Sequence, residues 1–398
     1  MKIKSETLRY NTAKALLAIY RKKAISRIEI AKQTGLTPAS VTHIINDLLN
    51  ENKIIETGEE VRDFSGSGRS RKLLTLNPTY GNLIGIEINM KGIFLVVTDT
   101  LGRLSYQTNL AINAFAVADI NQQIIKLIQA AINALPEANI LAAGIAIPGH
   151  LNLETQTILT NNEKWQHFNL NIINKEFAFP FVAENNIESM ALSEYLFHSE
   201  KSPEKSLFLH VGHGLFCSLF DGQQLGRRSN PYIGEIGHTV VDIQGAKCEC
   251  GKDGCLQTFI SDTWLINKST FLFNNSNNSV LNSMVNTADE ITIKVIADSY
   301  LLGDSYLKPM IDKGLFLLAT SIANTLLLHD ANKIYINSDL LNYHHFKDGV
   351  IEQIHSQLDF IPRKNEVQIE VLPMGPMRGA VGGAALASLT SFVDHVGF

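Results

Sequence analysis

Apolar residues recur along the chain in two periods, and the change of period divides it into an N-terminal module and a longer body. Before Asn82 the apolar positions follow the three- and four-residue spacing of helices. From Asn82 onward, short apolar runs typical of strands alternate with helical patterns. This succession predicts an α/β body of two sheet-and-helix lobes with a cleft between them.

The periods also give the expected elements of the body. Strands are expected at 83–89, 92–100, 104–112, 140–148, 179–185, 206–212, 215–225, 333–339 and 366–373. Helices are expected at 116–135, 187–197, 288–301, 304–328, 347–358 and 378–389, with an asparagine-rich loop at 273–282. The predicted domains are residues 1–78, then 79–200 completed by 378–398, then 201–377 with the helices expected to form the oligomer.

The N-terminal pattern is typical of a helix-turn-helix. After a first helix at 5–20, Ser26 and Glu29 have the spacing of a capping box, and Gly35 supplies the turn that ends the second helix. A third helix is expected over 37–50. Its inward stripe should consist of Val41, Ile44, Ile45, Leu48 and Leu49.

The third helix is expected to be the recognition helix, lying in a DNA major groove. Small polar side chains at its start leave room for close approach to base edges, whereas a plain helical hairpin is the alternative. Thr37 has the position of the N-cap and Pro38 that of the first helical residue. The residues expected to contact DNA on this helix are Thr37, Pro38, Ser40, Thr42 and His43.

A wing is expected to follow this helix. Strands at Lys53–Thr57 and Lys72–Leu76 flank a tip rich in glycine and serine. Arg69 and Arg71 lie in that small-residue context, so they can enter a narrow minor groove. A solvated linker is the alternative, because three acidic residues in the same segment would oppose DNA: Glu59, Glu60 and Asp63.

Charge is divided unevenly between the module and the body. Residues 1–75 hold 14 lysines and arginines against 8 aspartates and glutamates, a net charge of +6, whereas the remainder has a net charge of −11. A basic module on an acidic body predicts that double-stranded DNA meets one end of the protein. Ordinary variation of the surface explains the charge alone equally well.

Three of the four cysteines cluster after a histidine, within GEIGHTVVDIQGAKCECGKDGCLQ. His238, Cys248, Cys250 and Cys255 form a Cys3His set that suits a closed, structural tetrahedral Zn²⁺ site. The nearby glycines allow the backbone to direct the sulfurs to one point. The alternative is a disulfide pair plus chance, but Cys248 and Cys250 are too close in sequence to bridge comfortably.

The compartment is expected to be the cytoplasm. The N-terminus lacks the apolar region and cleavage site of a signal peptide, and no apolar stretch approaches the ~20 residues of a membrane span. Cytoplasmic thiols stay reduced and available for a metal. Hydrophobic residues make up 45% of the chain, which suits globular domains with real cores.

Five features together resemble the ROK family (repressors, open reading frames and sugar kinases) over nearly the whole chain. They are the winged helix, Pro148-Gly149, Glu184-Asn185-Asn186, Gly-Glu-Ile-Gly-His at 234–238, and the cysteine segment after it. The winged helix is similar to that of the repressor branch, which includes regulators of xylose, N-acetylglucosamine and glucose genes. The resemblance implies an actin-like (RNase H-like) bilobed fold, a sugar in the cleft, and a homodimer or homotetramer.

The resemblance also implies that kinase chemistry has been lost. The two glycine-rich phosphate turns of the kinases correspond to 87–91 and 212–216 here, where Met90 and Phe216 would crowd the backbone amides that cradle phosphate. The catalytic aspartate corresponds to Asn186, whose amide cannot take a proton from a sugar hydroxyl near neutral pH. Three late glycines still resemble the nucleotide-side helix, although close helix packing explains them better: Gly379, Gly382 and Gly383.

The sugar-binding positions are better kept. The resemblance implies contacts to a sugar or sugar phosphate effector from Asn185, Asn186, Glu235, His238 and Gln257. In this interpretation one ring nitrogen of His238 faces the sugar and the other faces zinc. Gln257 replaces the family's glutamate, so it keeps hydrogen bonding but loses charge. The alternative is that the polar residues only satisfy local backbone in a cleft without function.

These observations favour a ligand-responsive transcriptional regulator that controls genes of carbohydrate uptake or catabolism and has no enzyme activity. A sugar kinase carrying a DNA-binding domain is the second hypothesis, and ATP turnover would distinguish it. A third is a regulator controlled by a protein partner, in which the cleft is vestigial. The identity of the effector, the operator and the sign of the response do not follow from the sequence.

Overall fold

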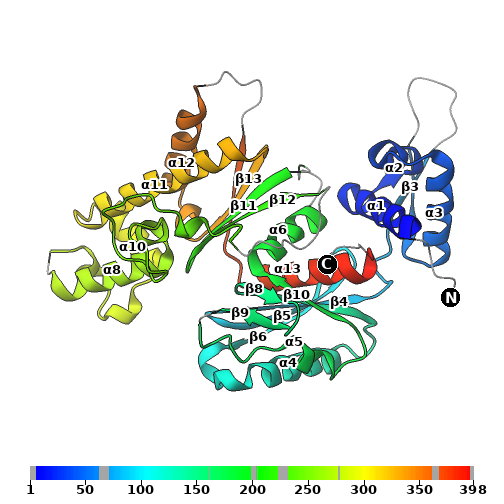
Figure 1. Cartoon of the computed structure of the whole chain (residues 1–398), viewed down its shortest axis with the longest axis horizontal. Helices are drawn as coiled ribbons and strands as arrows, with labels where there is room; N and C mark the ends of the chain where they lie inside the picture. Colours follow the sequence, from blue (N-terminus) through cyan, green and yellow to red (C-terminus); the bar gives the residue numbers. More distant parts are fainter. Residues whose placement is uncertain are drawn as a thin grey trace. The chain divides into compact units, whose positions relative to one another are not determined.

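The chain folds into two compact units (Figure 1). The computed structural model describes residues 6–61, 71–160, 162–198, 203, 205–222, 232–276, 278–360 and 367–394. Unit 1 comprises Met1–Ser202, Gln224–Ser229 and Pro376–Phe398, and unit 2 comprises Pro203–Gln223 and Asn230–Gly375. The chain therefore leaves unit 1, builds unit 2, and returns to unit 1 with its last helix.

The N-terminal module within unit 1 contains three helices and a small antiparallel sheet of strand order β1-β3-β2. Its elements are α1 (Glu6–Lys22), β1 (Ile25–Ser26), α2 (Arg27–Thr34), α3 (Pro38–Asn50), β2 (Ile54–Val61) and β3 (Arg71–Leu76). The expected helices and both flanking strands of the wing are present. The segment 62–70 between those strands lies outside the described residues.

The local signals that start and stop α2 act as expected. The Ser26 hydroxyl accepts from the Glu29 N–H at 3.4 Å, and the Glu29 carboxylate accepts from the Ser26 N–H at 3.0 Å. This reciprocal capping box satisfies backbone donors that have no partner inside a helix. Gly35 ends α2 with φ +69°, a left-handed conformation that glycine adopts without steric cost.

After the N-terminal module, unit 1 continues as a lobe built on a five-stranded sheet of order β10-β7-β4-β5-β6. Its strands are β4 (Asn82–Asn89), β5 (Gly92–Asp99), β6 (Leu104–Ala111), β7 (Ile140–Ile147) and β10 (Phe181–Asn185). β4, β7 and β10 run parallel, and β4, β5 and β6 form an antiparallel meander. A short hairpin follows β7, formed by β8 (His150–Asn152) and β9 (Thr157–Leu159).

Helices cover both faces of this sheet (Figure 1). They are α4 (Ile120–Ala134), α5 (Leu170–Asn174), α6 (Asn186–Phe197) and α13 (Arg378–Ala387), the last continued by a π-helical turn at Ser388–Phe392. The isoleucines of β4 pack with α4 and α5, whereas α6 and α13 cover the opposite face. α13 lies so close to the sheet that a Cβ at Gly85 or Gly144 would overlap its backbone.

Unit 2 is built on a four-stranded sheet of order β12-β11-β13-β14. Its strands are β11 (Lys205–Val211), β12 (Leu215–Asp221), β13 (Lys333–Ser338) and β14 (Gln368–Leu372). Its helices are α7 (Gln257–Ile260), α8 (Asp262–Asn275), α9 (Leu281–Met284), α10 (Ile293–Leu301), α11 (Leu307–Leu328) and α12 (His344–Leu358). One apolar core joins the sheet to these helices.

One segment of unit 2 differs from expectation. The stretch 273–282, expected to be a loop, includes the last turn of α8 and the first residues of α9. The Ser261 hydroxyl caps α8 by accepting from the Trp264 N–H at 3.2 Å. α8 carries few buried residues, so it shows no clear apolar stripe, and its asparagines favour loops on average. Tertiary packing and the serine cap therefore outweigh local propensity here.

The helix α11 is the one described helix that is long and apolar enough to cross a membrane, judged by length and composition alone. In the structure, 44% of its most apolar window is buried within the protein. Gly314 brings it against the backbone of Phe259 in α7. Such packing is typical of the core helix of a globular domain.

Candidate functional site

The cysteine segment of unit 2 is a folded loop held by its own backbone. The Cys248 carbonyl accepts from the N–H of Gly251 at 3.0 Å, and the Cys248 N–H donates to Lys252 at 2.8 Å, which makes a tight turn. Gly254 has φ +72°, and a Cβ there would overlap the carbonyl of Asp242. Only glycine fits at that position, so the turn that carries Cys255 depends on it.

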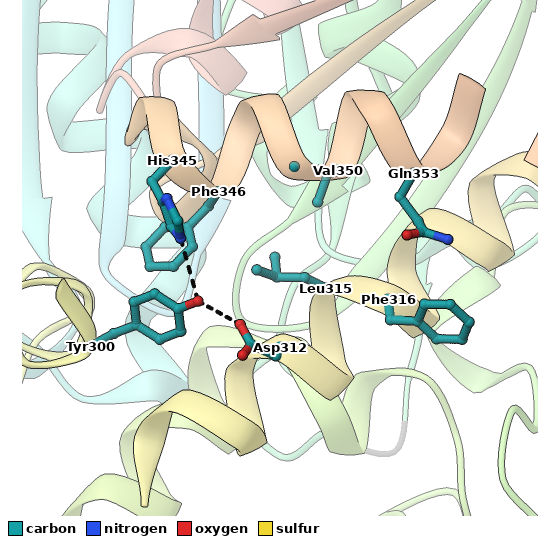
Figure 2. Close-up of a pocket in the computed structure, with 9 residues that line it drawn as sticks. Tyr300, Asp312, Leu315, Phe316, His345, Phe346, Val350 and Gln353 are labelled. Carbon is teal, nitrogen blue, oxygen red and sulfur yellow. Dashed lines mark hydrogen bonds between the residues drawn. The ribbon is translucent and has the colours of Figure 1, made fainter. Parts of the chain in front are cut away.

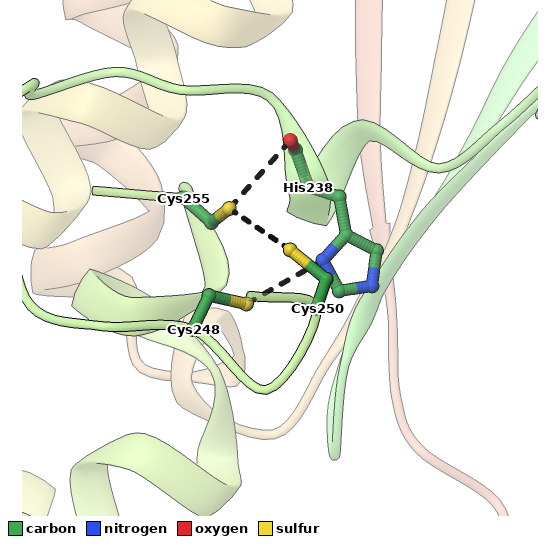
Figure 3. Close-up of side chains that lie close together, drawn as sticks. All are labelled: His238, Cys248, Cys250 and Cys255. Atoms are coloured by element: carbon green, nitrogen blue, oxygen red, sulfur yellow. Dashed lines mark hydrogen bonds between the residues drawn. The ribbon is translucent and has the colours of Figure 1, made fainter. Parts of the chain in front are cut away.

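This loop brings the four candidate metal ligands together (Figure 3). All four ligand atoms lie within 4.8 Å of one another. A tetrahedral Zn²⁺ with Zn–S of about 2.3 Å and Zn–N of about 2.0–2.1 Å would place sulfurs about 3.8 Å apart and sulfur about 3.5 Å from nitrogen. The separation of Cys250 Sγ and Cys255 Sγ is 3.6 Å, and that of Cys248 Sγ and His238 Nδ1 is 3.5 Å. The residues therefore fit a closed four-ligand site.

The environments of the thiols differ. Burial raises the pKa of the Cys255 thiol to about 12, and the two neighbouring thiols act in the same direction. A hydrogen bond from the Lys252 N–H lowers the pKa of Cys250. Thiolates this close repel one another, and a divalent cation among them would remove that repulsion.

Outer groups hold the ligands in place. The Gln257 amide donates to Cys248 Sγ at 3.4 Å and to Glu249 Oε1 at 3.1 Å. The Lys252 ammonium donates to the His238 carbonyl at 2.6 Å. Hydrogen bonds of this kind orient metal ligands. Gln257, expected to face a sugar, thus has its amide at the cysteine cluster.

The other expected sugar residues of unit 2 lie beside this loop. His238 directs Nδ1 toward the sulfurs, and its second ring nitrogen points away from them (Figure 3). Glu235 comes just before the short 3₁₀ turn Ile236–His238 and is partly exposed. Side chains of His238 and Gln257 both contact Cys248, so the structure gathers these two.

Asn185 and Asn186 belong to unit 1, at the start of α6. Asn185 is 3% exposed; its side-chain Oδ1 accepts from the N–H of Ile187 at 2.8 Å, and its side-chain Nδ2 donates to the Gly149 carbonyl at 3.1 Å. The side chain therefore caps α6 and ties it to the turn after β7. This contact is the local backbone role that stood as the alternative to sugar binding.

A buried carboxyl next to Asn186 was not assigned a role from the sequence. Glu87 lies between the buried Ile86 and Ile88 of β4 and is 4% exposed. Burial raises the pKa of its carboxyl to about 7, although side-chain hydrogen bonds from Asn89 and Asn186 and the N–H of Gly379 oppose the rise. A Cβ at Gly379 would overlap this carboxyl. The available signal was a single charged residue within LIGIEIN, a run in which isoleucine otherwise recurs at every second position.

The two turns that correspond to phosphate cradles carry side chains. Between β4 and β5, the Asn89 side chain accepts from the Lys91 N–H at 2.9 Å and closes the hairpin on itself. Between β11 and β12, Gly212 donates its N–H to Gly214 at 3.1 Å, and Phe216 is buried against Gly234. Both segments are tight hairpin turns whose polar groups bond locally.

In the N-terminal module, α3 presents the expected residues to solvent. Thr37, Pro38, Thr42 and His43 are exposed and Ser40 is half-buried, while the opposite stripe is buried, with Leu49 only half so. Thr37 caps the helix by accepting from the Ser40 N–H at 3.2 Å. Pro38 is the first helical residue, as expected.

The wing residues are only partly described. Arg69 lies outside the described residues, and Arg71 begins β3 with a half-buried side chain. The positive charge of Arg71 helps to lower the pKa of Glu29, a smaller cause than the hydrogen bonds from Ser26. A role of either arginine in a minor groove stays a prediction.

A hollow of about 200 Å³ lies in unit 2 between α11 and α12 (Figure 2). At one end the Tyr300 hydroxyl donates to Asp312 at 2.5 Å and lies 3.4 Å from His345 Nε2. Lys308 donates to the same hydroxyl at 3.0 Å. The polar groups bond to one another, and the rest of the hollow is lined mainly by apolar side chains such as Phe316.

Comparisons with known proteins agree across sequence and structure. The ROK family matches residues 83–389. The xylose repressor of Caldicellulosiruptor bescii is 25% identical over 393 residues, covering 97% of each chain. The N-acetylglucosamine repressor of Escherichia coli O157:H7 is 24% identical over 343 residues, covering 83% of this chain and 80% of its own.

The solved structures that resemble this one include regulators and kinases. A ROK family transcriptional regulator, a homologue of the E. coli Mlc protein, gives a TM-score of 0.75 at 23% identity and covers 98% of both chains. A ROK hexokinase from Thermus thermophilus gives 0.64 at 18% identity, covering 77% of this chain and 98% of its own. These likenesses establish the bilobed fold that regulators and kinases share.

Proposed function

Since this chain belongs to the ROK family, we propose that it is a sugar-responsive transcriptional repressor of carbohydrate uptake or catabolism genes and has no kinase activity. The observation that carries the proposal is the alignment of named repressors over nearly the full chain, N-terminal module included. In this proposal the module binds double-stranded DNA, the body binds the effector, and the protein acts in the cytoplasm.

DNA binding is assigned to the exposed face of α3 and to the wing. Thr42 and His43 project from the first half of the helix, where side chains of a recognition helix reach base edges. The net charge of +6 over residues 1–75 supports phosphate contacts that release counterions. Two modules of a homodimer, or of a homotetramer, would occupy two major grooves of a near-palindromic site.

Effector binding is assigned to the polar groups that flank the proposed zinc loop in unit 2 and the start of α6 in unit 1. Glu235 and the ring nitrogen of His238 that points away from the sulfurs have the chemistry to hold sugar hydroxyls. A structural Zn²⁺ held by His238 and three cysteines would fix that imidazole in place. A sugar or a sugar phosphate is the effector class, and it acts through unequal affinity for two conformations.

The absence of kinase activity is inferred from the side chains at three separate positions. Asn186 has no basicity near neutral pH, and the carboxyl to which it donates, Glu87, is buried and bonded to its neighbours. Met90 stands in the first of the two turns that would have to cradle phosphates, and Phe216 lies in β12 directly after the second. Because a hexokinase shares this fold, a sugar kinase with a DNA-binding domain is the alternative that experiment must exclude.

The test is fluorescence anisotropy of a DNA fragment from upstream of the protein's own gene. Tight binding that weakens steeply with salt, and changes when xylose or N-acetylglucosamine is added, is the expected result. Thr42→Glu should abolish binding, whereas Gln122→Glu on the exposed side of α4 should reduce it far less. Absence of DNA binding together with ATP turnover on a hexose would overturn the proposal.

Thermal-shift measurements separate sugar control from control by a protein partner. Xylose, N-acetylglucosamine, glucose and their phosphates are tested at concentrations well above the expected dissociation constants. Stabilisation by at least one of them is expected, because a ligand that binds only the folded state raises the unfolding temperature. No stabilisation by any of them would favour a protein partner.

A further inference from the structure

The N-terminal module is joined to the rest of unit 1 through a fully buried hydroxyl pair. The Tyr20 hydroxyl, near the end of α1, donates to the Thr100 carbonyl at 2.6 Å and lies 2.5 Å from Ser388 Oγ. Tyr20 is 3% exposed and Ser388 fully buried. Burial raises the pKa of Tyr20, so its hydroxyl stays protonated and keeps donating. Because these groups have no access to water, losing one partner would leave a buried polar atom unsatisfied.

Further contacts surround this pair at the same junction. The Tyr20 ring packs edge-on against Phe392, with ring centroids 6.2 Å apart. Lys53, which follows α3, donates to the Phe392 carbonyl at 3.4 Å. The Thr100 hydroxyl donates to Asn77 at 2.9 Å, in the segment that links β3 to β4. The junction thus ties α1 and Lys53 to one short turn at Ser388–Phe392, whereas the linker is tied to Thr100.

That turn is the π-helical end of α13. Isolated π-helical turns are rare and commonly lie at functional positions of a helix. Here the wider turn spans Ser388–Phe392 and includes both the serine that contacts Tyr20 and the phenylalanine that packs on it. The geometry of α13 at this end therefore determines where α1 is held.

The other end of α13 lies at the cluster of Glu87 and Asn186. The N–H of Gly379 donates to the Glu87 carboxyl, which also accepts from Asn186. The half-buried Arg378 forms an ion pair with the buried Glu194 of α6, and a Cβ at Gly382 would overlap the α6 backbone near Ser189. α13 and α6 are therefore packed without slack, and a shift at the start of α6 must move α13.

A cavity of about 350 Å³ borders the junction itself. Its walls include Tyr20 and Thr75 from the module, and Gly102 and Phe197 from the lobe. The space beside Tyr20 is therefore not filled, although its hydroxyl is buried, and the module has room to tilt there. The directional contacts of its hydroxyl then matter more for its orientation than they would in a filled interface.

We propose that Tyr20 is a positioning residue: its hydroxyl, held by Thr100 and Ser388, sets the orientation of the DNA-binding module and makes α13 the path along which events at Asn185 and Asn186 reach α1. The role in regulation rests on the proposed function, whereas the mechanical link does not. α13 is a rigid element with one end at each site, which is the physical requirement for such coupling.

The mechanical link is tested by amide hydrogen exchange on the full-length protein. Tyr20→Phe and Ser388→Ala should each raise exchange in Glu6–Lys22 by about tenfold, the size expected for loss of one buried hydrogen bond. Two matched controls remove hydroxyls on the same helices, outside the pair: Tyr10→Phe, whose ring is half exposed, and Thr390→Val, which bonds Leu386 within its own helix. Unchanged exchange in both junction variants, or equal changes in the controls, would overturn the link.

Communication along α13 is tested without any ligand. Glu87→Gln perturbs the far end, and we expect it to change exchange in α1 in the wild-type background but not in the Tyr20→Phe background. Additive effects of the two substitutions would overturn the proposed path.

In the same proteins, the change in DNA affinity caused by xylose or N-acetylglucosamine should nearly disappear in Tyr20→Phe, while the affinity for the sugar is retained. If the wild-type protein binds no DNA, the proposed function is refuted. The hydrogen exchange measured in α1 then still decides whether the mechanical link between α1 and α13 exists.

Discussion

At the scale of single residues, Glu87 shows how a buried carboxyl joins the segments around Asn186. A carboxyl with few exposed atoms bonds to two asparagine amides and one backbone N–H, all from segments that a kinase would use for phosphate and proton transfer. These donors come from three segments that are distant in sequence, so the Glu87 carboxyl links the β4–β5 turn, α6 and α13. Because burial raises the pKa of the Glu87 carboxyl, its charge changes near neutral pH.

The first prediction concerns that charge. Burial raises the pKa of folded Glu87 to about 7 from the ordinary 4.5, so the folded state binds the proton more tightly. The protonated carboxyl of Glu87 then contributes at most about 3 kcal/mol to the free energy of unfolding. This contribution is fully present below pH 4.5 and is lost as the pH rises to about 7. Urea unfolding of the wild type from about pH 4.5 to 8 should show this loss, and Glu87→Gln should flatten it. Equal pH slopes in the two proteins would contradict the assignment.

The second prediction concerns the metal ligands. Purified protein should contain about one zinc per chain by mass spectrometry of metals, because His238 and three cysteines have the separations of a tetrahedral site. Cys255→Ser should lose the metal and about 3 kcal/mol or more of unfolding free energy. Cys217→Ser, in β12 and outside the cluster, is the control that should keep it. Metal retained in Cys255→Ser would argue against the site.

At the scale of elements, sequence signals located most helices and strands because those signals are local. The Ser26 capping box, the left-handed Gly35 and the proline that begins α3 each act within a few residues, and all three are present. α8 was missed because its stability comes from a cap and from packing partners distant in sequence. Likewise, no local pattern places Gly379 beside Glu87, since that contact depends on how β4 and α13 meet.

The third prediction concerns the packing of α13 on the sheet. At Gly144 a Cβ would overlap the Gly383 carbonyl, so Gly144→Ala should force the helix away and cost about 1–3 kcal/mol. Gly349, inside α12, has open space where a methyl group would lie, so Gly349→Ala should instead stabilise by about 0.5–1 kcal/mol. Chemical unfolding of the two variants measures both effects. A cost at Gly349 equal to that at Gly144 would show that the close approach is not what matters.

At the scale of the whole molecule, the chain combines a family fold with side chains unsuited to the family's phosphotransfer. The pairing of the basic module with an acidic body was readable from composition, and the two-lobed order of strands and helices from periodicity. What the sequence left open is the second contact of Asn185: its capping of α6 is local, but its bond to Gly149 depends on the meeting of β7 and β10. The proposed absence of kinase activity therefore rests on several segments at once, and not on Asn186 alone.

The last prediction tests that statement by restoring a single part. Asn186→Asp returns a potential base but places a second carboxyl against buried Glu87, and two such groups cannot both ionise cheaply. The variant should therefore show no ATP-dependent phosphorylation of glucose, xylose or N-acetylglucosamine, since Met90 in the first turn and Phe216 directly after the second are unchanged. It should also unfold at a lower temperature than the wild type at about pH 8, with a smaller difference at about pH 5, where a shared proton relieves the repulsion. A coupled assay of ADP release and thermal unfolding at the two pH values give both readings, and turnover above the wild-type background would mean that a missing base was the only thing separating this protein from a kinase.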